Sequence, residues 1–419
     1  MKKIICVLLA VSSLVLLLGC EGTNATQSKT ASIPSSDTVS VEKDKKIVFA
    51  SSRDPWLSRE QSQLDVIKEK LGITVEFKLY HPSTIASDIA SGVASNNAPD
   101  IYYVKGYLPS ALAVLQPLEN SGLDLACMEN QAILNASKFS GKHYLYAGFD
   151  PDFFWSDVCV YNKALFEKAK AVTPDEFYKN DEWTLENFAL SARKIAALGE
   201  EYIGAGLLDE SSLSIAGESF FSFIDNRIGY SKSEKLVSVM EVLNTLYCEG
   251  TIKLDRTGFK NGKQGMALTN TFGLLKSGFF AGADFENIGI TFMPKPNNKD
   301  DHIISAQLSG FGIVKGSKNI NNAGAVIKEL TSFDVFEEKG QDVFISEEAK
   351  EFYKKLCDKQ KNNCFYYISS DVSESTNIGE VFHAKWGQID SDKFKRYIND
   401  SYFTMSQMVD VANEIMCRR

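Results

Sequence analysis

The chain has 419 residues, a formal net charge of -9 at pH 7 and 44% hydrophobic residues. Its acidic balance, with no basic stripe along the sequence, argues against a nucleic-acid partner and against adhesion to anionic lipid. A single hydrophobic core stops growing at roughly 250–300 residues, so we expect this chain to form more than one lobe.

The first twenty residues have the pattern of an export signal. Two lysines precede an apolar run over residues 4–18, which is too short for an ordinary transmembrane helix. The tetrad Leu17-Leu18-Gly19-Cys20 resembles a bacterial lipobox. The resemblance implies that residues 1–19 are removed and that Cys20 carries lipid, including palmitate, which anchors the protein to a membrane. The alternative is a secreted protein in which Cys20 is incidental.

Residues 20–44 are predicted to be a flexible tether. They are rich in Ser, Thr, Asn, Gln and Lys and show no hydrophobic periodicity. Such a segment cannot bury enough apolar surface to offset the entropy lost on ordering.

Strands and helices then alternate along the chain. We expect a strand over residues 47–50, a helix capped by Ser58 and stopped by Gly72, a strand over 73–80, a helix from Ser83 and a strand over 101–104. This alternation predicts a parallel sheet covered by helices. In such sheets ligands bind beyond the carboxyl ends of the strands, here residues 51–56 and 103–107.

The rest of the chain is less regular. Residues 163–302 are predicted to be mainly helical, with a strand around Gly265-Met266-Ala267. A strand over 312–314 follows, and helices are expected over 321–333, 347–356 and 392–416.

Six cysteines remain beyond the lipobox, and their spacing fits no metal site. Cys357 and Cys364 are the only close pair, which makes one local disulfide a hypothesis for an exported protein. Free, buried thiols at all six positions are the competing interpretation. The six are Cys127, Cys159, Cys248, Cys357, Cys364 and Cys417.

Four sequence blocks together indicate a family. They are Lys46-Ile47-Val48-Phe49 with Gly72-Ile73-Thr74-Val75 and Ala98-Pro99-Asp100-Ile101; Val160-Tyr161-Asn162-Lys163 with Trp183-Thr184-Leu185-Glu186; Gly265-Met266-Ala267-Leu268; and Met293-Pro294-Lys295-Pro296 with Gly312-Ile313-Val314-Lys315. In this order, behind a lipobox, they resemble extracellular solute-binding proteins of the family that includes maltose-binding protein. These are the substrate receptors of ABC importers.

The resemblance implies an α/β fold with two lobes and a ligand cleft between them. Lobe 1 is expected to comprise residues 45–157 and 303–369, and lobe 2 residues 158–302 and 370–419. A hinge would let the lobes close over a solute, and the closed form would be recognised by the membrane permease.

Candidate ligand-binding residues lie where the cleft loops should fall. Charged groups can bond sugar hydroxyls, and an aromatic ring can stack on the apolar face of a sugar. The competing interpretation is hinge packing and loop ion pairs. The candidates are Arg53, Asp54, Trp56, Tyr103, Asp150, Trp155, Asp157, Phe272, Gly310 and Trp386.

Catalytic and metal motifs are missing from the sequence. Its 4 histidines are isolated, and there is no His-Glu-x-x-His, no Gly-x-Ser-x-Gly and no Gly-Lys-Ser/Thr phosphate loop. A carboxylate pair for glycosidic cleavage stays open, because the 54 acidic residues offer many pairs, although no motif selects one of them. We therefore expect no enzyme, no catalytic residues, no metal and no cofactor.

The leading hypothesis is a monomeric, lipid-anchored receptor on the extracytoplasmic face of the cell membrane. It would bind a small solute, a carbohydrate by family habit, and deliver it to an ABC permease. The acidic loops favour neutral or cationic ligands over anions. The alternatives are a surface sensor for a receptor kinase and a lipoprotein glycan hydrolase.

Overall fold

The computed structural model describes residues 45–52, 62–82, 84–105, 108–150, 153–208, 211–218, 221–224, 227–230, 233–332, 343–361, 364–367, 371–373 and 376–377. Several sequence predictions lie outside these residues: the signal peptide, the tether, Cys20, Arg53, Asp54, Trp56, the cap at Ser58, Trp386, Cys417 and the helix over 392–416. In the described part of the chain, no helix is sufficiently long and apolar to span a bilayer.

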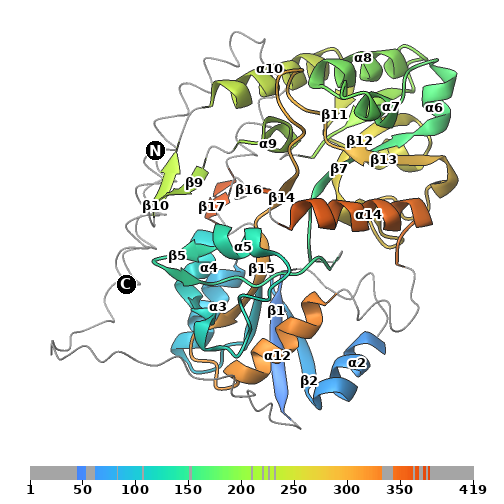
Figure 1. Ribbon diagram of the computed structural model, residues 1–419. Coiled ribbons are helices and arrows are strands. Elements are labelled where there is room, and N and C mark those ends of the chain that lie inside the picture. Colours follow the sequence, from blue (N-terminus) through green and yellow to red (C-terminus); the bar gives the residue numbers. More distant parts are fainter. Residues whose placement is uncertain are drawn as a thin grey trace. The chain divides into compact units, whose positions relative to one another are not determined.

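The first sheet has five strands in the order β2-β1-β3-β15-β4 (Figure 1). The strands are β1 (Lys46–Ser51), β2 (Thr74–Leu79), β3 (Ile101–Lys105), β4 (Leu115–Gln116) and β15 (Ser309–Val314). β1 pairs in parallel with β2 and β3, as the alternating pattern predicts, whereas β15 is antiparallel to β3 and β4. As a result, Lys105 at the carboxyl end of β3 pairs with Ser309 at the amino end of β15.

The helices associated with this sheet are α2 (Ser62–Leu71), α3 (Ile85–Ala94), α4 (Leu108–Val114) and α12 (Ile320–Thr331). α2 lies against β2, and α12 contacts both α2 and β15. Gly72 follows the last residue of α2 with a φ of 69°, a left-handed conformation that glycine adopts without steric cost. The predicted stop of this helix at Gly72 is therefore confirmed.

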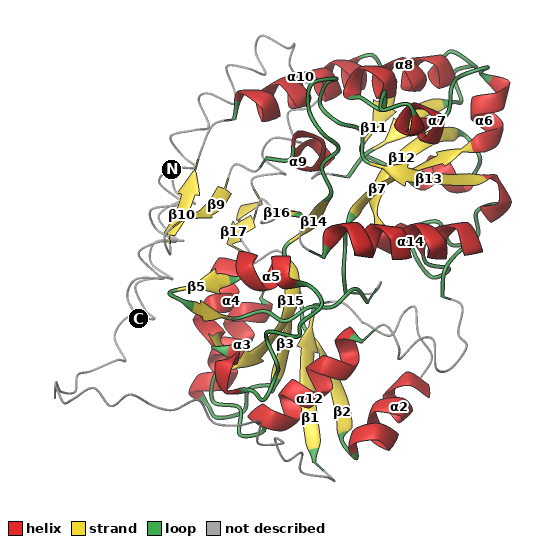
Figure 2. Cartoon of the chain, in the orientation of Figure 1, coloured by secondary structure: helices red, strands yellow, loops and turns green. Residues whose placement is uncertain are grey.

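The second sheet also has five strands, in the order β11-β8-β12-β7-β13 (Figure 2). The strands are β7 (Asp157–Asn162), β8 (Ile203–Gly206), β11 (Ile252–Lys253), β12 (Gln264–Asn270) and β13 (Ile288–Phe292). β12 is parallel to β8 and antiparallel to β7, which places Asn270 opposite Asp157. The carboxyl end of β12 and the amino end of β7 thus share one edge.

The helices associated with the second sheet are α6 (Lys163–Lys168), α7 (Pro174–Lys179), α8 (Leu185–Ala196), α10 (Glu234–Cys248), α11 (Thr257–Lys260) and α14 (Glu347–Gln360). The predicted strand around Gly265-Met266-Ala267 is confirmed as β12, but the prediction that the rest of residues 163–302 is mainly helical missed β8, β11 and β13. All of β12 and β13 is buried, so these strands lack the alternation of polar and apolar residues that marks a half-exposed strand.

Helix α14 departs from the expected division of the chain. The sequence places residues 303–369 in lobe 1, yet α14 contacts β13 and the short helix η3 (Thr271–Leu274) beside the second sheet. Its buried Tyr353 and Leu356 belong to the same hydrophobic cluster as Phe292 of β13. We therefore propose that α14 belongs to lobe 2.

The remaining elements are short. They are η2 (Leu118–Asn120), α5 (Gln131–Ala136), β5 (Lys138–Phe139), β6 (Lys142–His143), α9 (Ser211–Ala216), β9 (Phe221–Ile224), β10 (Arg227–Tyr230), η4 (Phe285–Asn287), β14 (Ser305–Gln307), β16 (Phe365–Tyr367), β17 (Asp371–Ser373) and β18 (Thr376–Asn377).

The hypothesis of a local disulfide is wrong, because Cys357 and Cys364 are both free thiols. Cys357 lies within α14 and contacts Tyr353 one turn earlier, whereas Cys364 contacts Tyr366 of β16. Burial raises the pKa of both thiols. The helix continues beyond Cys357 to Gln360, so the two side chains meet different neighbours.

Candidate functional site

The candidate site lies where two chain segments lead from one sheet to the other. Residues 153–156 precede β7, and residues 305–308 precede β15. The two segments pair at an isolated bridge between Ser156 and Ala306. The strand ends nearest to them are Lys105 of β3 and Asn270 of β12.

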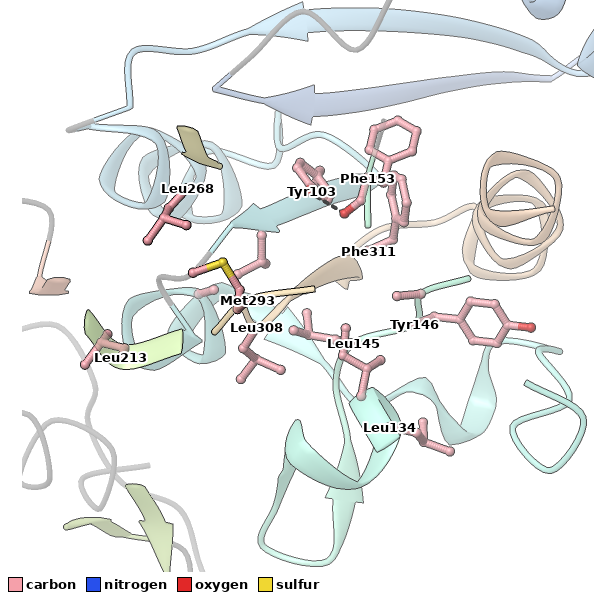
Figure 3. Close-up of a cluster of buried hydrophobic side chains, with 14 of the residues drawn as sticks. Tyr103, Leu134, Leu145, Tyr146, Phe153, Leu213, Leu268, Met293, Leu308 and Phe311 are labelled. Carbon is pink, nitrogen blue, oxygen red and sulfur yellow. Dashed lines mark hydrogen bonds between the residues drawn. The ribbon is translucent and has the colours of Figure 1, made fainter. Parts of the chain in front are cut away.

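Hydrogen bonds tie the first segment to both sheets. The carbonyl of Phe153 accepts from Tyr103 Oη at 2.9 Å and from Ser309 Oγ at 3.3 Å, both in the first sheet. Figure 3 shows the Tyr103 bond beside the ring of Phe311. The next carbonyl, that of Phe154, accepts from Thr271 Oγ1 at 2.6 Å, directly after β12. Neighbouring carbonyls are therefore held by different sheets.

The backbone around Trp155 is held in the same way. Its carbonyl accepts from the N–H of Gln307 at 3.2 Å. Ser156 Oγ donates to the carbonyl of Ser305 at 2.8 Å and accepts from Gln360 Nε2 at 2.6 Å. These bonds fix the position from which the indole of Trp155 projects.

Three rings form a row, which we call the aromatic row: Trp155, Phe272 and Phe279. Trp155 stacks on Phe272 with ring centroids 5.8 Å apart and an interplanar angle of 18°. Phe272 meets Phe279 edge to face at 5.1 Å. Asn270 Oδ1 accepts from the N–H of Phe272 at 3.2 Å and caps η3, which orients the backbone that carries Phe272.

A cation lies over each end of the aromatic row. Lys105 Nζ lies 3.6 Å from the ring centroid of Trp155. The guanidinium of Arg256 lies 3.9 Å from the ring centroid of Phe279, and its Nη1 donates to Thr269 Oγ1 at 3.2 Å. Both are cation–π contacts, in which the negative face of the ring attracts the positive charge.

Polar groups border the row from the second sheet. Asp157 begins β7, and its Oδ2 accepts a hydrogen bond from Ser214 of the buried helix α9. Asn270 lies opposite it in the register of β7 and β12. Together with the rings, these carboxylate, hydroxyl and amide groups supply the contact types that a polar ligand with an apolar face needs.

The structure brings some of the predicted residues together and not others. Trp155 and Phe272 are in direct contact, and Asp157 lies two residues along the chain from Trp155. Tyr103 donates its hydroxyl to a buried carbonyl within the protein. Asp150 is only 1% exposed.

Gly310 lies in the backbone of β15, where it pairs with Val104. A Cβ atom there would come within 3.1 Å of the carbonyl oxygen of Tyr146. The close packing of the chain around Gly310 favours a structural reason for this glycine.

Sequence reasoning missed Lys105, Ser214, Arg256, Asn270 and Phe279. Lys105 could have been found, because it ends the strand that contains Tyr103 and has the same parity along it. The other four lie on elements that only the fold brings to Trp155. Among the described residues, no group of three or more His, Cys, Asp or Glu is placed to hold a metal ion.

Comparison with known sequences gives a family match. The model of the family described as bacterial extracellular solute-binding protein matches residues 60–334, more than half of the 419 residues. A comparison with curated protein sequences finds no significant match.

Solved structures share the fold over nearly all of their length. The GacH receptor of Streptomyces glaucescens, solved unliganded and with acarbose, superposes with a TM-score of 0.64 at 15% identity, covering 88% of this chain and 99% of GacH. The galacto-N-biose/lacto-N-biose I-binding protein of Bifidobacterium longum gives 0.65 at 14% identity, with 89% and 99% covered. A binding protein of B. animalis subsp. lactis, in complex with β-1,6-galactobiose, gives 0.61 at 16%, with 87% and 98% covered.

These likenesses confirm the predicted two-lobe α/β fold. The matched family and the three structures are of binding proteins rather than enzymes.

Proposed function

Since the chain belongs to the bacterial extracellular solute-binding protein family, we propose that it is the substrate receptor of an ABC importer and that it binds a carbohydrate. The observation that carries this proposal is the aromatic row, beside Asp157, Ser214 and Asn270 at the strand ends. Aromatic faces suit the apolar C–H face of a sugar ring, and the polar groups suit its hydroxyls. The sugar ligands of GacH and of the two bifidobacterial proteins support the same class.

The receptor would act by closing over its ligand. The two lobes, joined by residues 153–156 and 305–308, would enclose the sugar, and the contacts made only in the closed form would stabilise it. Cys20 would carry the lipid that holds the receptor on the extracytoplasmic face of the membrane. The permease would then recognise the closed form.

Isothermal titration calorimetry of the purified full chain against mono-, di- and oligosaccharides tests the proposal. We expect saturable binding of one sugar class, and we expect Trp155→Ala to weaken it at least tenfold. Tyr202→Ala is the matched control, because Tyr202 also carries a cation–π contact, from Lys168 at 4.5 Å, but precedes the amino end of β8. The amino end of β8 lies beside Gln264, at the opposite end of β12 from Asn270. Binding of amino acids or polyamines alone would refute the carbohydrate class.

The anchor is tested separately in cells. The wild-type chain should incorporate labelled palmitate and sediment with membranes, and Cys20→Ala should do neither. Palmitate incorporation that survives Cys20→Ala would contradict the proposed lipidation site.

A further inference from the structure

The ring of Trp155, on which the proposed function depends, is almost fully covered by other parts of the protein. Trp155 is only 6% exposed. Phe272 stacks on the indole with ring centroids 5.8 Å apart, and Lys105 Nζ lies 3.6 Å from the centroid of the ring. A sugar can therefore stack on this ring only after a group that covers it has moved away.

Phe272 is held beside Trp155 by the residue that precedes it. The N–H of Thr271 donates to the carbonyl of Ser156 at 2.8 Å, and its Oγ1 donates to the carbonyl of Phe154 at 2.6 Å. These two carbonyls lie on either side of Trp155 in the chain, so the backbones that carry the two rings are tied together. Phe272 is itself only 8% exposed. The stacked pair of rings is thus a fixed unit.

Lys105 covers the ring in a different way. It is the last residue of β3, and its backbone is held by pairing with Ser309. Its ammonium group, however, stands at the end of a flexible four-carbon side chain, so it can leave the indole while the strand stays in place. On leaving, the ammonium regains water and the side chain regains rotamer freedom. Lys105 is therefore the covering group that a ligand displaces most easily.

Displacement of Lys105 lowers the affinity for the ligand. A cation–π contact is stronger where the ring is shielded from water, as it is at Trp155. This contact exists only while the sugar is absent from the ring face, so sugar and ammonium compete for one surface. The apparent affinity falls in proportion to the fraction of molecules in which the face is available.

From this geometry we propose that Lys105 is an internal competitor of the ligand. It covers the ring of Trp155 in the ligand-free protein, and the sugar takes its place on that ring face. Lys105 thereby sets the receptor's affinity below the value that the aromatic row alone would give. The inference rests on the proposed function, because it concerns the regulation of the same site.

Calorimetry of the full chain with the neutral saccharide that binds the wild type most tightly tests the competition. We expect Lys105→Ala to bind this saccharide at least about threefold more tightly, because the cation–π contact is lost only from the ligand-free state. Lys105→Arg keeps a cation that can lie over the ring and should show no such gain. Lys194→Ala removes an exposed positive charge from α8 and is the control, with unchanged affinity.

A double-mutant cycle tests whether the gain passes through the ring. The same titrations are repeated with Trp155→Ala and with Lys105→Ala/Trp155→Ala. Any other contact that Lys105 makes contributes in both backgrounds and cancels in the cycle. We expect the gain from Lys105→Ala to disappear once the indole is absent. A gain that persists in the Trp155→Ala background would overturn the inference.

The remaining outcomes separate the inference from the proposed function. Unchanged or weaker binding by Lys105→Ala would overturn the internal competition and leave the carbohydrate receptor intact. Binding of a saccharide by Lys105→Ala and not by the wild type would support the competition. No binding of any saccharide by either protein would refute the proposed function itself. If Lys105→Ala does not fold, Lys105→Gln replaces it, because glutamine also lacks the charge.

Discussion

Replacing Tyr103 with phenylalanine separates a structural role for its hydroxyl from a role in ligand binding. The hydroxyl donates to the carbonyl of Phe153 at 2.9 Å in a buried environment. Ser309 Oγ lies 3.3 Å from the same oxygen and shares its one proton between it and the carbonyl of Gln307, also at 3.3 Å. The ring also contacts Phe153 at 5.1 Å and Phe311 at 5.3 Å. Tyr103→Phe keeps these ring contacts and removes only the hydroxyl.

The expected loss of stability is modest because a second donor remains. A net intramolecular hydrogen bond contributes about 0.5–1.5 kcal/mol, so we expect Tyr103→Phe to lower the free energy of unfolding by about 1 kcal/mol. In the double variant Tyr103→Phe/Ser309→Ala the carbonyl loses both of these donors. A buried group left without a partner costs about 1–3 kcal/mol. The double variant should therefore lose on the order of 1 kcal/mol more than the sum of the single variants.

Urea denaturation of the four proteins, followed by tryptophan fluorescence, measures this cycle. Calorimetry of Tyr103→Phe with the sugar found for the wild type should show an affinity within about threefold. Additive losses in the cycle would refute the shared carbonyl. A tenfold loss of affinity at unchanged stability would show that the hydroxyl serves the ligand instead.

Three further predictions concern pH, packing and redox state. Burial lowers the pKa of His302, and Lys295 and Lys359 act in the same direction, while the backbone of Met293 and the carboxylate of Asp181 oppose them. Because the imidazole of the unfolded chain has a pKa of about 6.5, the wild type should lose stability as the pH falls below that value. Thermal melts between pH 5 and 7 should show a smaller loss for His302→Gln, and parallel curves for the two proteins would contradict this. Gly289→Ala places a Cβ atom against the Tyr161 ring, so thermal melts should show a loss of about 1–3 kcal/mol, and a neutral effect would refute the clash. Dithiothreitol should leave the melting temperature of the full chain unchanged, because the described cysteines are free thiols; a clear drop would reveal a disulfide.

The first sheet could be predicted well because its signals are local. The strand over 73–80 alternates polar and apolar residues, and Gly72 marks the end of the helix before it. In the second sheet only β12 was expected, from the strand around Gly265-Met266-Ala267, because β13 is buried throughout and β11 has two residues. A buried strand carries no alternation, and periodicity alone cannot distinguish it from a buried helical segment.

The candidate site could be predicted only where its residues lie near one another in the sequence. The cluster of aromatic and acidic residues before β7 pointed to Trp155 and Asp157, and the position after the Gly-Met-Ala strand pointed to Phe272. The cations over the aromatic row gave no such signal. Arg256 reaches Phe279 only because α11, β12 and the segment after η3 fold together, and this long-range packing has no local pattern.

The carbonyl groups of Phe153 and Phe154 set a limit on any motion of one sheet against the other. The first is bonded to β3 and β15, and the second to Thr271 beyond β12. On the return segment, Gln307 bonds to Trp155 and Ser309 bonds to Phe153, so only Leu308 lies between the two attachments. A rotation that preserves these bonds must therefore change the backbone torsion angles between the carbonyls of Phe153 and Phe154 on the first segment. On the return segment it must change the torsion angles of Leu308. Leu308 is itself buried in the hydrophobic core, so this narrow connection between the sheets is also held in place by packing.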